Sequence, residues 1–207
     1  MKRNVVNIVI IVVIIFVVLF LVNLCRNYSI LNGIYDSNEN FKNSVKNYHI
    51  VKNYDLNMEI TKTIKEDVYF NEGIYLVKTY MNEEIYNIGW CNTNTNESIS
   101  VDKTLGNSKE LESNTDFYKE RYYEKDLLLY ENGKNSEITS QILMKNIFKP
   151  ITIKDGCYVI EANNSIIYVD KETKLVKKYI QGDTTVTLSV EEGTVTADDI
   201  AKDRVYE

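Results

Sequence analysis

The pattern of apolar and polar residues divides the chain into one long apolar segment and a series of short alternating segments. Val5–Val22 is an 18-residue run in which Asn7 is the only polar residue. As a helix rising about 1.5 Å per residue, it spans about 27 Å, close to the hydrocarbon thickness of a bilayer. The run is rich in valine and isoleucine, but a lone strand would leave its backbone groups unpaired in lipid. The sequence therefore predicts one transmembrane helix over residues 5–24.

From about residue 50 onward, apolar residues recur at every second position, the period of a half-buried strand. Turn-forming sequences separate these segments, and they fall at 71–73, 82–83, 92–96, 163–164, 171–173 and 182–183. Short strands joined by tight turns are typical of an antiparallel sheet. The residues after the membrane segment thus predict one β-rich domain.

Three segments between the strands have a less regular pattern. Asp36 or Ser37 can cap a helix that contains Phe41, Val45 and Tyr48, although the repeated asparagines there also suit a loop. Residues 103–126 are polar, and they fit a helix or a loop equally well. LLLYENG, residues 127–133, reads as a strand. Ser136 can then cap a second helix, which holds Ile138, Ile142, Leu143 and Ile147 and stops before Pro150.

The residues on either side of the apolar run predict whether it is cleaved and how it is oriented in the membrane. A cleaved export signal needs an A-x-A-like site, and a lipoprotein signal needs a small residue before its cysteine, whereas Leu24 precedes Cys25. We therefore expect an uncleaved anchor, with acylation of Cys25 as the alternative. Lys2 and Arg3 outweigh Arg26, so the N-terminus is expected in the cytoplasm. The expected organisation is a cytoplasmic end (1–4), an anchor (5–24), a juxtamembrane segment (25–36) and an extracytoplasmic domain (37–207).

The net charge of the exported part limits the classes of partner that it can be expected to bind. Three of the 24 basic residues and none of the 30 acidic residues precede residue 27, so the rest of the chain carries a net charge of −9. A domain with this balance is a poor candidate for binding nucleic acid or an anionic lipid surface. Its acidity is most simply a means of staying soluble.

The sequence contains no recognisable catalytic constellation. His49 is the only histidine, which excludes any site that needs two imidazoles. No nucleophile elbow, zinc-protease helix, phosphate-binding glycine loop or CxxC pair is present. Adjacent acidic residues point to opposite sides of a strand and are read as solvated charge; they are Glu83-Glu84, Glu191-Glu192 and Asp198-Asp199. We expect a protein that is not an enzyme and that binds no metal or cofactor.

Three cysteines remain. Cys25 lies at the membrane boundary, where it serves as a small apolar residue or as a lipidation site. Cys91 and Cys157 lie on predicted strands of an exported domain, so a disulfide between them is one alternative. The other is that Cys157 is a small buried hydrophobic residue beside Val159.

Read together, the exported segments resemble the LolA-like superfamily, which includes LolA, LppX and the N-terminal domain of RseB. The likeness covers about Phe41–Ile200 and is strongest from Ser136. It consists of SEITSQILMKNIF, DGCYVIEA, SIIYVDKETKLVKKYIQG, TTVTLSVE and GTVTADDI, and YVDKET-L resembles the family's "Y-[IV]-D-x-x-T-x-L" hairpin. The family tail usually continues to a proline, whereas AKDRVYE follows here. The chain also resembles membrane-attached proteins of spore-forming bacteria, among them the germination lipoprotein GerS, which engages a cell-wall amidase.

The resemblance implies a mainly β (α+β) domain, in which a curved antiparallel sheet forms an unclosed barrel covered by helices. It also implies a function: binding of an apolar ligand, such as a lipid acyl chain, or of a partner protein. The alternative is a non-catalytic regulatory subunit of an envelope or spore complex, for example a partner of a cell-wall hydrolase. A tethered chain cannot diffuse between membranes, so lipoprotein ferrying is not expected.

Strand alternation predicts which side chains line the apolar side of the sheet. Trp90 shares a strand face with Tyr86 and Ile88, while Asn87 and Gly89 lie on the other face. Threonines and a serine alternate with the apolar residues of the strand near the C-terminus. Both apolar sets are expected on the concave side, where the resemblance implies a cavity lined by Tyr86, Ile88, Trp90, Val186, Leu188 and Val190.

Overall fold

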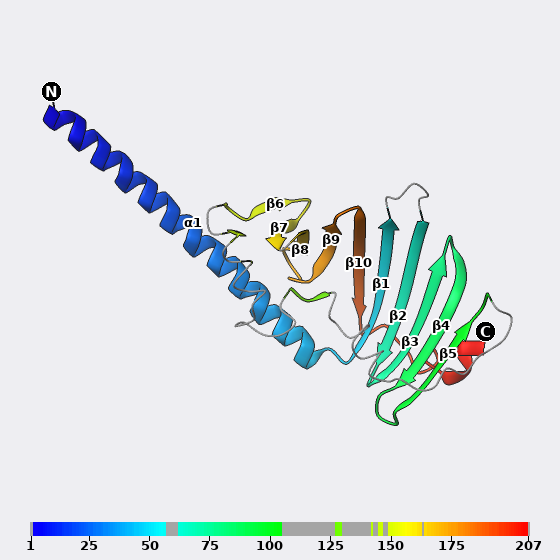
Figure 1. Cartoon of the computed structure of the whole chain (residues 1–207). Helices are drawn as coiled ribbons and strands as arrows, with labels where there is room; N and C mark the ends of the chain where they lie inside the picture. Colours follow the sequence, from blue (N-terminus) through cyan, green and yellow to red (C-terminus); the bar gives the residue numbers. More distant parts are fainter. Residues whose placement is uncertain are drawn as a thin grey trace.

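The computed structural model of the chain describes residues 2–56, 62–104, 127–129, 142, 145–146, 149–162 and 164–206. It contains one long N-terminal helix, α1 (Lys2–Ser44), and a single ten-stranded antiparallel sheet (Figure 1). The strand order is β5-β4-β3-β2-β1-β10-β9-β8-β7-β6, so β5 and β6 are the two edges and the sheet is not closed. The expected mainly β, unclosed antiparallel architecture with one N-terminal apolar helix is confirmed.

The sheet is built from two runs of hairpins. The first run comprises β1 (Asn47–Leu56), β2 (Lys62–Asn71), β3 (Ile74–Met81), β4 (Glu84–Asn92) and β5 (Glu97–Asp102). The second run comprises β6 (Thr152–Lys154), β7 (Cys157–Ala162), β8 (Ser165–Asp170), β9 (Val176–Gln181) and β10 (Thr184–Glu192). Antiparallel pairing of β1 with β10 joins the two runs at the middle of the sheet.

The turns follow from local sequence, as predicted. Glu72 and Gly73 both have positive φ, 46° and 90°, as a two-residue hairpin turn requires. A Cβ on Gly73 would lie 2.8 Å from Asn94 Nδ2, because the β4–β5 turn packs against this one. Asp170 fixes the β8–β9 turn, where its Oδ1 accepts hydrogen bonds from the backbone N–H groups of Glu172 and Thr173. The YVDKET-L resemblance therefore rests on turn chemistry.

α1 is one continuous helix, which differs from the predicted organisation. Its apolar N-terminal part is long and apolar enough to cross a membrane, and that part is exposed. The expected juxtamembrane segment, 25–36, is not a separate element, because it is helical and contributes Leu31 and Ile34 to the core. The predicted helix that starts near Ser37 is the end of α1, and Tyr48 lies beyond it on β1.

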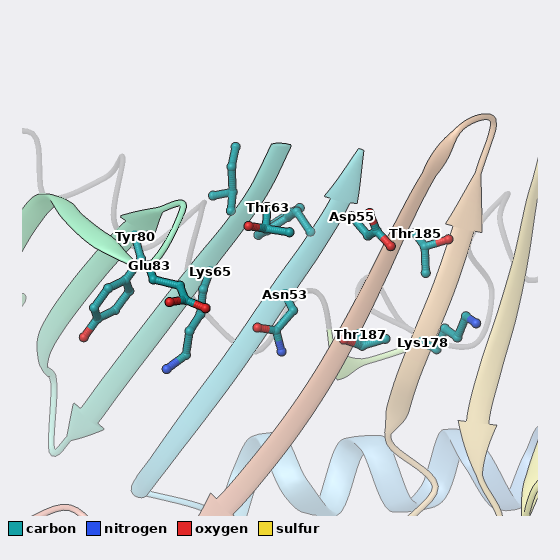
Figure 2. Close-up of a pocket in the computed structure, with 11 residues that line it drawn as sticks. Asn53, Asp55, Thr63, Lys65, Tyr80, Glu83, Lys178, Thr185 and Thr187 are labelled. Carbon is teal, nitrogen blue, oxygen red and sulfur yellow. The ribbon is translucent and has the colours of Figure 1, made fainter. Parts of the chain in front are cut away.

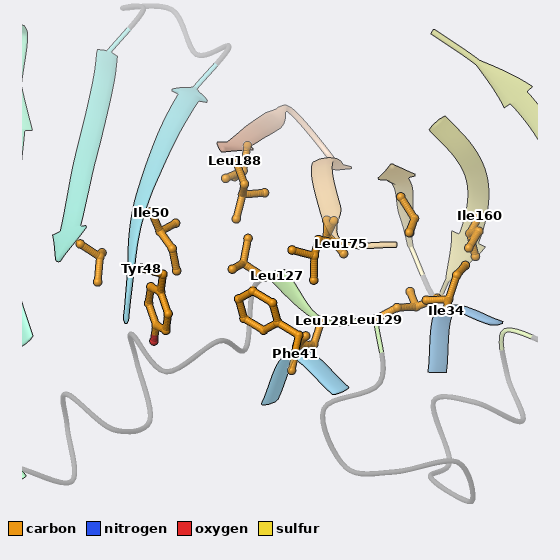
Figure 3. Packing of buried hydrophobic residues seen from close by; sticks show 14 of the residues in the cluster. Ile34, Phe41, Tyr48, Ile50, Leu127, Leu128, Leu129, Ile160, Leu175 and Leu188 are labelled. Carbon is orange, nitrogen blue, oxygen red and sulfur yellow. The ribbon is translucent and has the colours of Figure 1, made fainter. Parts of the chain in front are cut away.

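The larger apolar cluster lies between the sheet and the C-terminal half of α1 (Figure 3). Of the residues that the structure describes, 23 are buried in it, including Ile34 and Phe41 from α1 and Ile50, Ile160 and Leu188 from the strands. The rings of Tyr48 and Phe70 stack with their centroids 4.8 Å apart. This face of the sheet, called the helix face below, is therefore packed with side chains of the chain itself.

The smaller cluster lies on the other face of β2–β5. It joins Leu76, Ile88, Trp90, Ile99 and Val101 of the strands to Val195, Ile200 and Val205 of the C-terminal segment. Trp90 Nε1 donates a 2.8 Å hydrogen bond to the carbonyl oxygen of Ile200. The AKDRVYE tail thus folds back on the sheet, and Lys202–Tyr206 forms a 3₁₀-helix.

Two predictions from the middle of the chain meet different outcomes. Leu127–Leu129 is not a strand; the three leucines are buried in the larger cluster and form no ladder with the sheet. Residues 105–126 of the polar segment 103–126 and most of the predicted helix 136–147 lie outside the described residues. Ile142, which that helix would contain, is fully buried in the same cluster.

Candidate functional site

The face of the sheet opposite α1 carries a polar groove of about 700 Å³ over β1, β2, β3, β9 and β10 (Figure 2). We call this face the outer face. The labelled side chains of the groove stand on the near side of the strands in Figure 2, with α1 behind them. The lining residues are Asn53, Tyr54, Asp55, Thr63, Ile64, Lys65, Tyr80, Glu83, Lys178, Thr185 and Thr187.

Cross-strand register brings five polar residues into one row across the groove. Lys65 pairs with Tyr80 on one side and with Asn53 on the other, and Thr187 lies between Asn53 and Lys178. Residues directly opposite each other have Cβ atoms about 5 Å apart and share a face. We call Tyr80, Lys65, Asn53, Thr187 and Lys178 the polar row.

The charges around the groove are balanced. Lys65 and Lys178 supply two cations, and Asp55 and Glu83 supply two carboxylates. Each lysine also lies over a tyrosine ring: Lys65 Nζ is 5.0 Å from the ring centre of Tyr80, and Lys178 Nζ is 5.5 Å from that of Tyr168. The groove therefore offers hydrogen-bond donors, acceptors and aromatic edges without a strong net charge.

Beside the groove, the buried carboxylate of Asp67 contacts the side chains of Lys65 and His49. Lys65 Nζ is 2.9 Å from Asp67 Oδ2, and His49 Nε2 is 3.6 Å from Asp67 Oδ1. Burial by itself raises the pKa of the Asp67 carboxyl, but the contacts with His49 and Lys65 outweigh burial and hold that pKa below its usual value. Asp67 is therefore ionised at neutral pH and fixes Lys65 at the edge of the groove.

Two tyrosines of this face, Tyr69 and Tyr80, remain protonated at neutral pH. Burial, followed by the charge of Asp67, raises the pKa of Tyr80 to about 12. The same two causes and the charge of Asp199 raise the pKa of Tyr69, whose ring stacks on His49 at 4.3 Å between centroids. Their hydroxyl groups can donate hydrogen bonds to a ligand, but at neutral pH they are not bases.

The arrangement is suited to binding. Among the described residues, no group of three or more histidine, cysteine or acidic side chains is placed to hold a metal ion. A groove of hydroxyl, amide and paired charged groups can recognise a polar ligand or a segment of a protein. It was missed in the sequence because its residues come from five strands, although Thr185 and Thr187 were correctly placed opposite the apolar positions of their strand.

The six predicted cavity residues are divided between the two faces. Val186, Leu188 and Val190 lie on the helix face, in or against the larger cluster, whereas Ile88 and Trp90 belong to the smaller cluster on the outer face. Tyr86 is 38% exposed. The expectation that all six line one concave side is wrong, and the space around Trp90 is filled by the C-terminal segment.

The error has a simple cause in the register. Trp90 pairs with Leu76, Leu76 with Tyr69, and Tyr69 with His49, while Val186 pairs with Tyr54. His49 and Tyr54 are five residues apart on β1, and an odd separation places two residues on opposite faces of a strand. Gly89 and Cys91, read as the water side of β4, are buried too, so β4 is covered on both faces.

The cysteines are separate in the structure. Cys91 on β4 and Cys157 on β7 are buried and neither is in a disulfide, and six strands lie between β4 and β7, so the suggested disulfide is wrong. Burial raises the pKa of the Cys157 thiol, which disfavours the reactive thiolate. Cys25 is exposed on α1, and its acylation stays a prediction.

Comparison of the sequence with family models and curated proteins identifies no relative of the chain. No protein-family model matches the chain. No curated protein matches its sequence either.

Proposed function

We propose that the protein is a membrane-anchored, non-catalytic binding module that engages a partner protein of the cell envelope through the groove on its outer face. The observation that carries this proposal is the polar row. It lines a groove on the face opposite α1, and the cross-strand register brings one polar side chain from each of five strands into it.

The anchor and its orientation support an extracytoplasmic site of action. The apolar part of α1 is exposed along its length, as lipid contact requires. Lys2 and Arg3 precede it, and this charge bias favours a cytoplasmic N-terminus with the sheet domain outside. A partner of the domain would then belong to the envelope.

The packing of the helix face favours a partner protein, rather than an acyl chain, as the ligand of this domain. A LolA-like carrier would hold its apolar ligand on that face, but Ile34, Phe41 and Leu127 already fill space there. Near its middle, Lys52 and Glu66 lie directly opposite each other, and both are 2% exposed. Tyr54 Oη donates a 3.0 Å hydrogen bond to Glu66. Buried charges of this kind are unfavourable neighbours for a hydrocarbon chain.

The LolA-like resemblance and the likeness to GerS fit the same proposal. A relative that engages a cell-wall amidase offers one type of partner, and such a role needs no catalytic residues in this chain. A sporulation or germination complex is accordingly one setting in which we place the protein.

The proposal can be tested in intact cells with a photoreactive amino acid at Thr187, an exposed member of the polar row. Irradiation should give a discrete adduct with one envelope protein. The control carries the photoreactive amino acid at position 171 instead, because Lys171 is exposed in the β8–β9 turn. It should give no adduct. Lys178→Glu should weaken the Thr187 adduct, whereas Lys171→Glu should not.

Two results would overturn the proposal. One is equal labelling from Thr187 and Lys171. The other is lipid that copurifies in stoichiometric amount with the full-length protein and is lost in Leu188→Ala, because that outcome assigns the helix face to an apolar ligand.

A further inference from the structure

The position of Asn27 on α1 fixes the height of the domain above the membrane. The apolar run ends at Val22, and α1 continues through Asn27 without a break. Five residues of helix correspond to a rise of about 7.5 Å. The headgroup region of a bilayer is about 5–8 Å thick on each side of the hydrocarbon core. Asn27 therefore lies at the depth of the lipid headgroups.

Asn27 ties the domain to the helix at this depth. Its side chain is buried, and its Nδ2 donates hydrogen bonds to the carbonyl oxygens of Asn146 and Lys149. Its Oδ1 accepts a 3.1 Å hydrogen bond from the backbone N–H of Ile151. Arg26 donates a further hydrogen bond to the carbonyl oxygen of Ile151. Asn146, Lys149 and Ile151 are thus held where α1 leaves the membrane.

Further along α1, the side chain of Asn38 makes a second set of hydrogen bonds that joins the helix to the domain. Its Nδ2 donates to the carbonyl oxygen of Lys174, and its Oδ1 accepts from the backbone N–H of Leu129. Two buried asparagines eleven residues apart leave α1 little freedom to swing away from the sheet. The orientation of the domain relative to the membrane helix is therefore fixed.

The surface next to the hydrogen bonds of Asn27 differs from the rest of the domain. Lys145, Lys149 and Lys154 are exposed, and Ile153 on the edge strand β6 is 50% exposed. Tyr28, one position beyond Asn27, is 53% exposed. Figure 1 shows β6 beside α1, at the end of the domain nearest the N-terminal part of the helix. Lysines around an exposed apolar and an aromatic side chain are typical of surfaces that meet a membrane interface.

We propose that this edge of the domain, formed by Tyr28 of α1, by Lys145 and Lys149, and by Ile153 and Lys154 on the two sides of the edge strand β6, docks on anionic phospholipid headgroups of the bilayer that α1 spans. The net charge of −9 beyond residue 26 makes the domain as a whole unsuited to such a surface, but at this edge the three lysines outnumber the exposed acidic neighbours Asp155 and Glu161. Lys149 pairs with Glu161 at 3.1 Å, but both side chains are exposed and such pairs are weak, so lipid phosphate can compete for the lysine.

Docking in this way has a consequence for the groove. The polar row begins on β9, three strands from the edge strand β6 in the sheet order, and extends away from it to β3, so the groove is held at a set orientation to the bilayer. The inference does not rest on the proposed function, because a lipid contact at β6 is independent of what the groove binds.

The test uses the full-length protein in vesicles that carry a nitroxide on the lipid headgroup, with tryptophan fluorescence as the readout. Ile153→Trp places a reporter on the docking surface, and Ile85→Trp on the distant strand β4 is the matched control, since Ile85 is 38% exposed. The unaltered protein gives the contribution of Trp90. We expect severalfold stronger quenching at position 153 than at position 85.

The lipid charge is varied in the same experiment. Phosphatidylglycerol added to phosphatidylcholine vesicles should increase quenching at position 153, and Lys149→Glu with Lys154→Glu should abolish that increase. Lys171→Glu with Lys178→Glu makes the same charge change elsewhere and should leave it intact. Unshifted Trp90 emission checks that each variant is folded. Equal quenching at 153 and 85 would overturn the proposed contact, and quenching that ignores phosphatidylglycerol would overturn the choice of anionic lipid.

Discussion

The two faces of the sheet are stabilised in different ways. The helix face packs 23 buried residues into one continuous cluster with the C-terminal half of α1. The outer face buries eight residues in a second cluster near one edge, and it keeps a polar groove over the middle strands. The same strands supply both faces, because alternate residues of β1 and β10 point in opposite directions.

The two faces of the sheet contribute differently to the stability of the protein. The helix face provides most of the hydrophobic stabilisation, since burial of apolar area is the main favourable contribution to folding. The outer face needs apolar cover only where the C-terminal segment crosses it. Elsewhere it carries the polar and charged side chains that line the groove, so substitutions on the two faces should differ in what they damage.

The largest effect is expected from Ile34→Ala. Ile34 is fully buried between α1 and the sheet, and truncation there leaves a cavity. We expect a loss of about 3–4 kcal/mol in the free energy of unfolding, measured by denaturant titration of the full-length protein in detergent. Ile166→Ala, at a 40% exposed position, is the control and should cost much less. Similar losses at both positions would mean that α1 is not packed on the sheet.

A smaller loss is expected from Val205→Ala in the C-terminal segment. Val205 is fully buried against the cluster that contains Trp90. Removing two methyl groups should cost about 2–3 kcal/mol and loosen the cover over the indole. Trp90 emission should shift to longer wavelength, whereas Ile34→Ala should leave the native emission unchanged. If Val205→Ala leaves both stability and emission unaltered, the tail does not cover the outer face.

Asp67→Asn tests the charged cluster beside the groove. It removes the carboxylate that pairs with Lys65, and we expect a cost of about 1–2 kcal/mol at neutral pH. Because the folded-state pKa of Asp67 is lowered, its stabilisation is present above the unfolded value of 3.8 and is lost as pH falls through the folded value. The difference between wild type and variant should therefore shrink below about pH 4. A difference that grows on acidification would show that the sign of the shift is wrong.

The smallest effect on stability is expected from Thr187→Ala in the polar row. Thr187 is exposed, and removal of its hydroxyl should change the free energy of unfolding by less than about 0.5 kcal/mol. Adduct formation from a photoreactive residue at Asn53, also in the row, should nevertheless weaken. Leu188→Ala, one residue along on the helix face, should show the opposite pattern, with lower stability and, in the protein that remains folded, an unchanged adduct.

The elements with strong local signals were predictable. The apolar run predicted a helix that is long and apolar enough to cross a membrane, and the turns at 71–73, 82–83, 171–173 and 182–183 marked hairpins that the structure contains. The alternation of Val186 and Leu188 with threonines predicted which side of β10 is buried, and that prediction is confirmed. In each case the deciding interactions are between neighbours in sequence, so they can be read from a few residues.

The tertiary structure alone decided which segment covers which face. An amphipathic strand indicates that one side is buried, but it does not name the partner. The sequence therefore predicts Trp90 on the same concave side as Leu188, whereas the tail from Val195 to Val205 covers it on the opposite face. The continuity of α1 past residue 25 depends on contacts such as those of Asn27 with Lys149 and Ile151, more than 100 residues away. The groove likewise requires the register of five strands. Local patterns determine which residues are buried, whereas long-range packing determines against what they are buried.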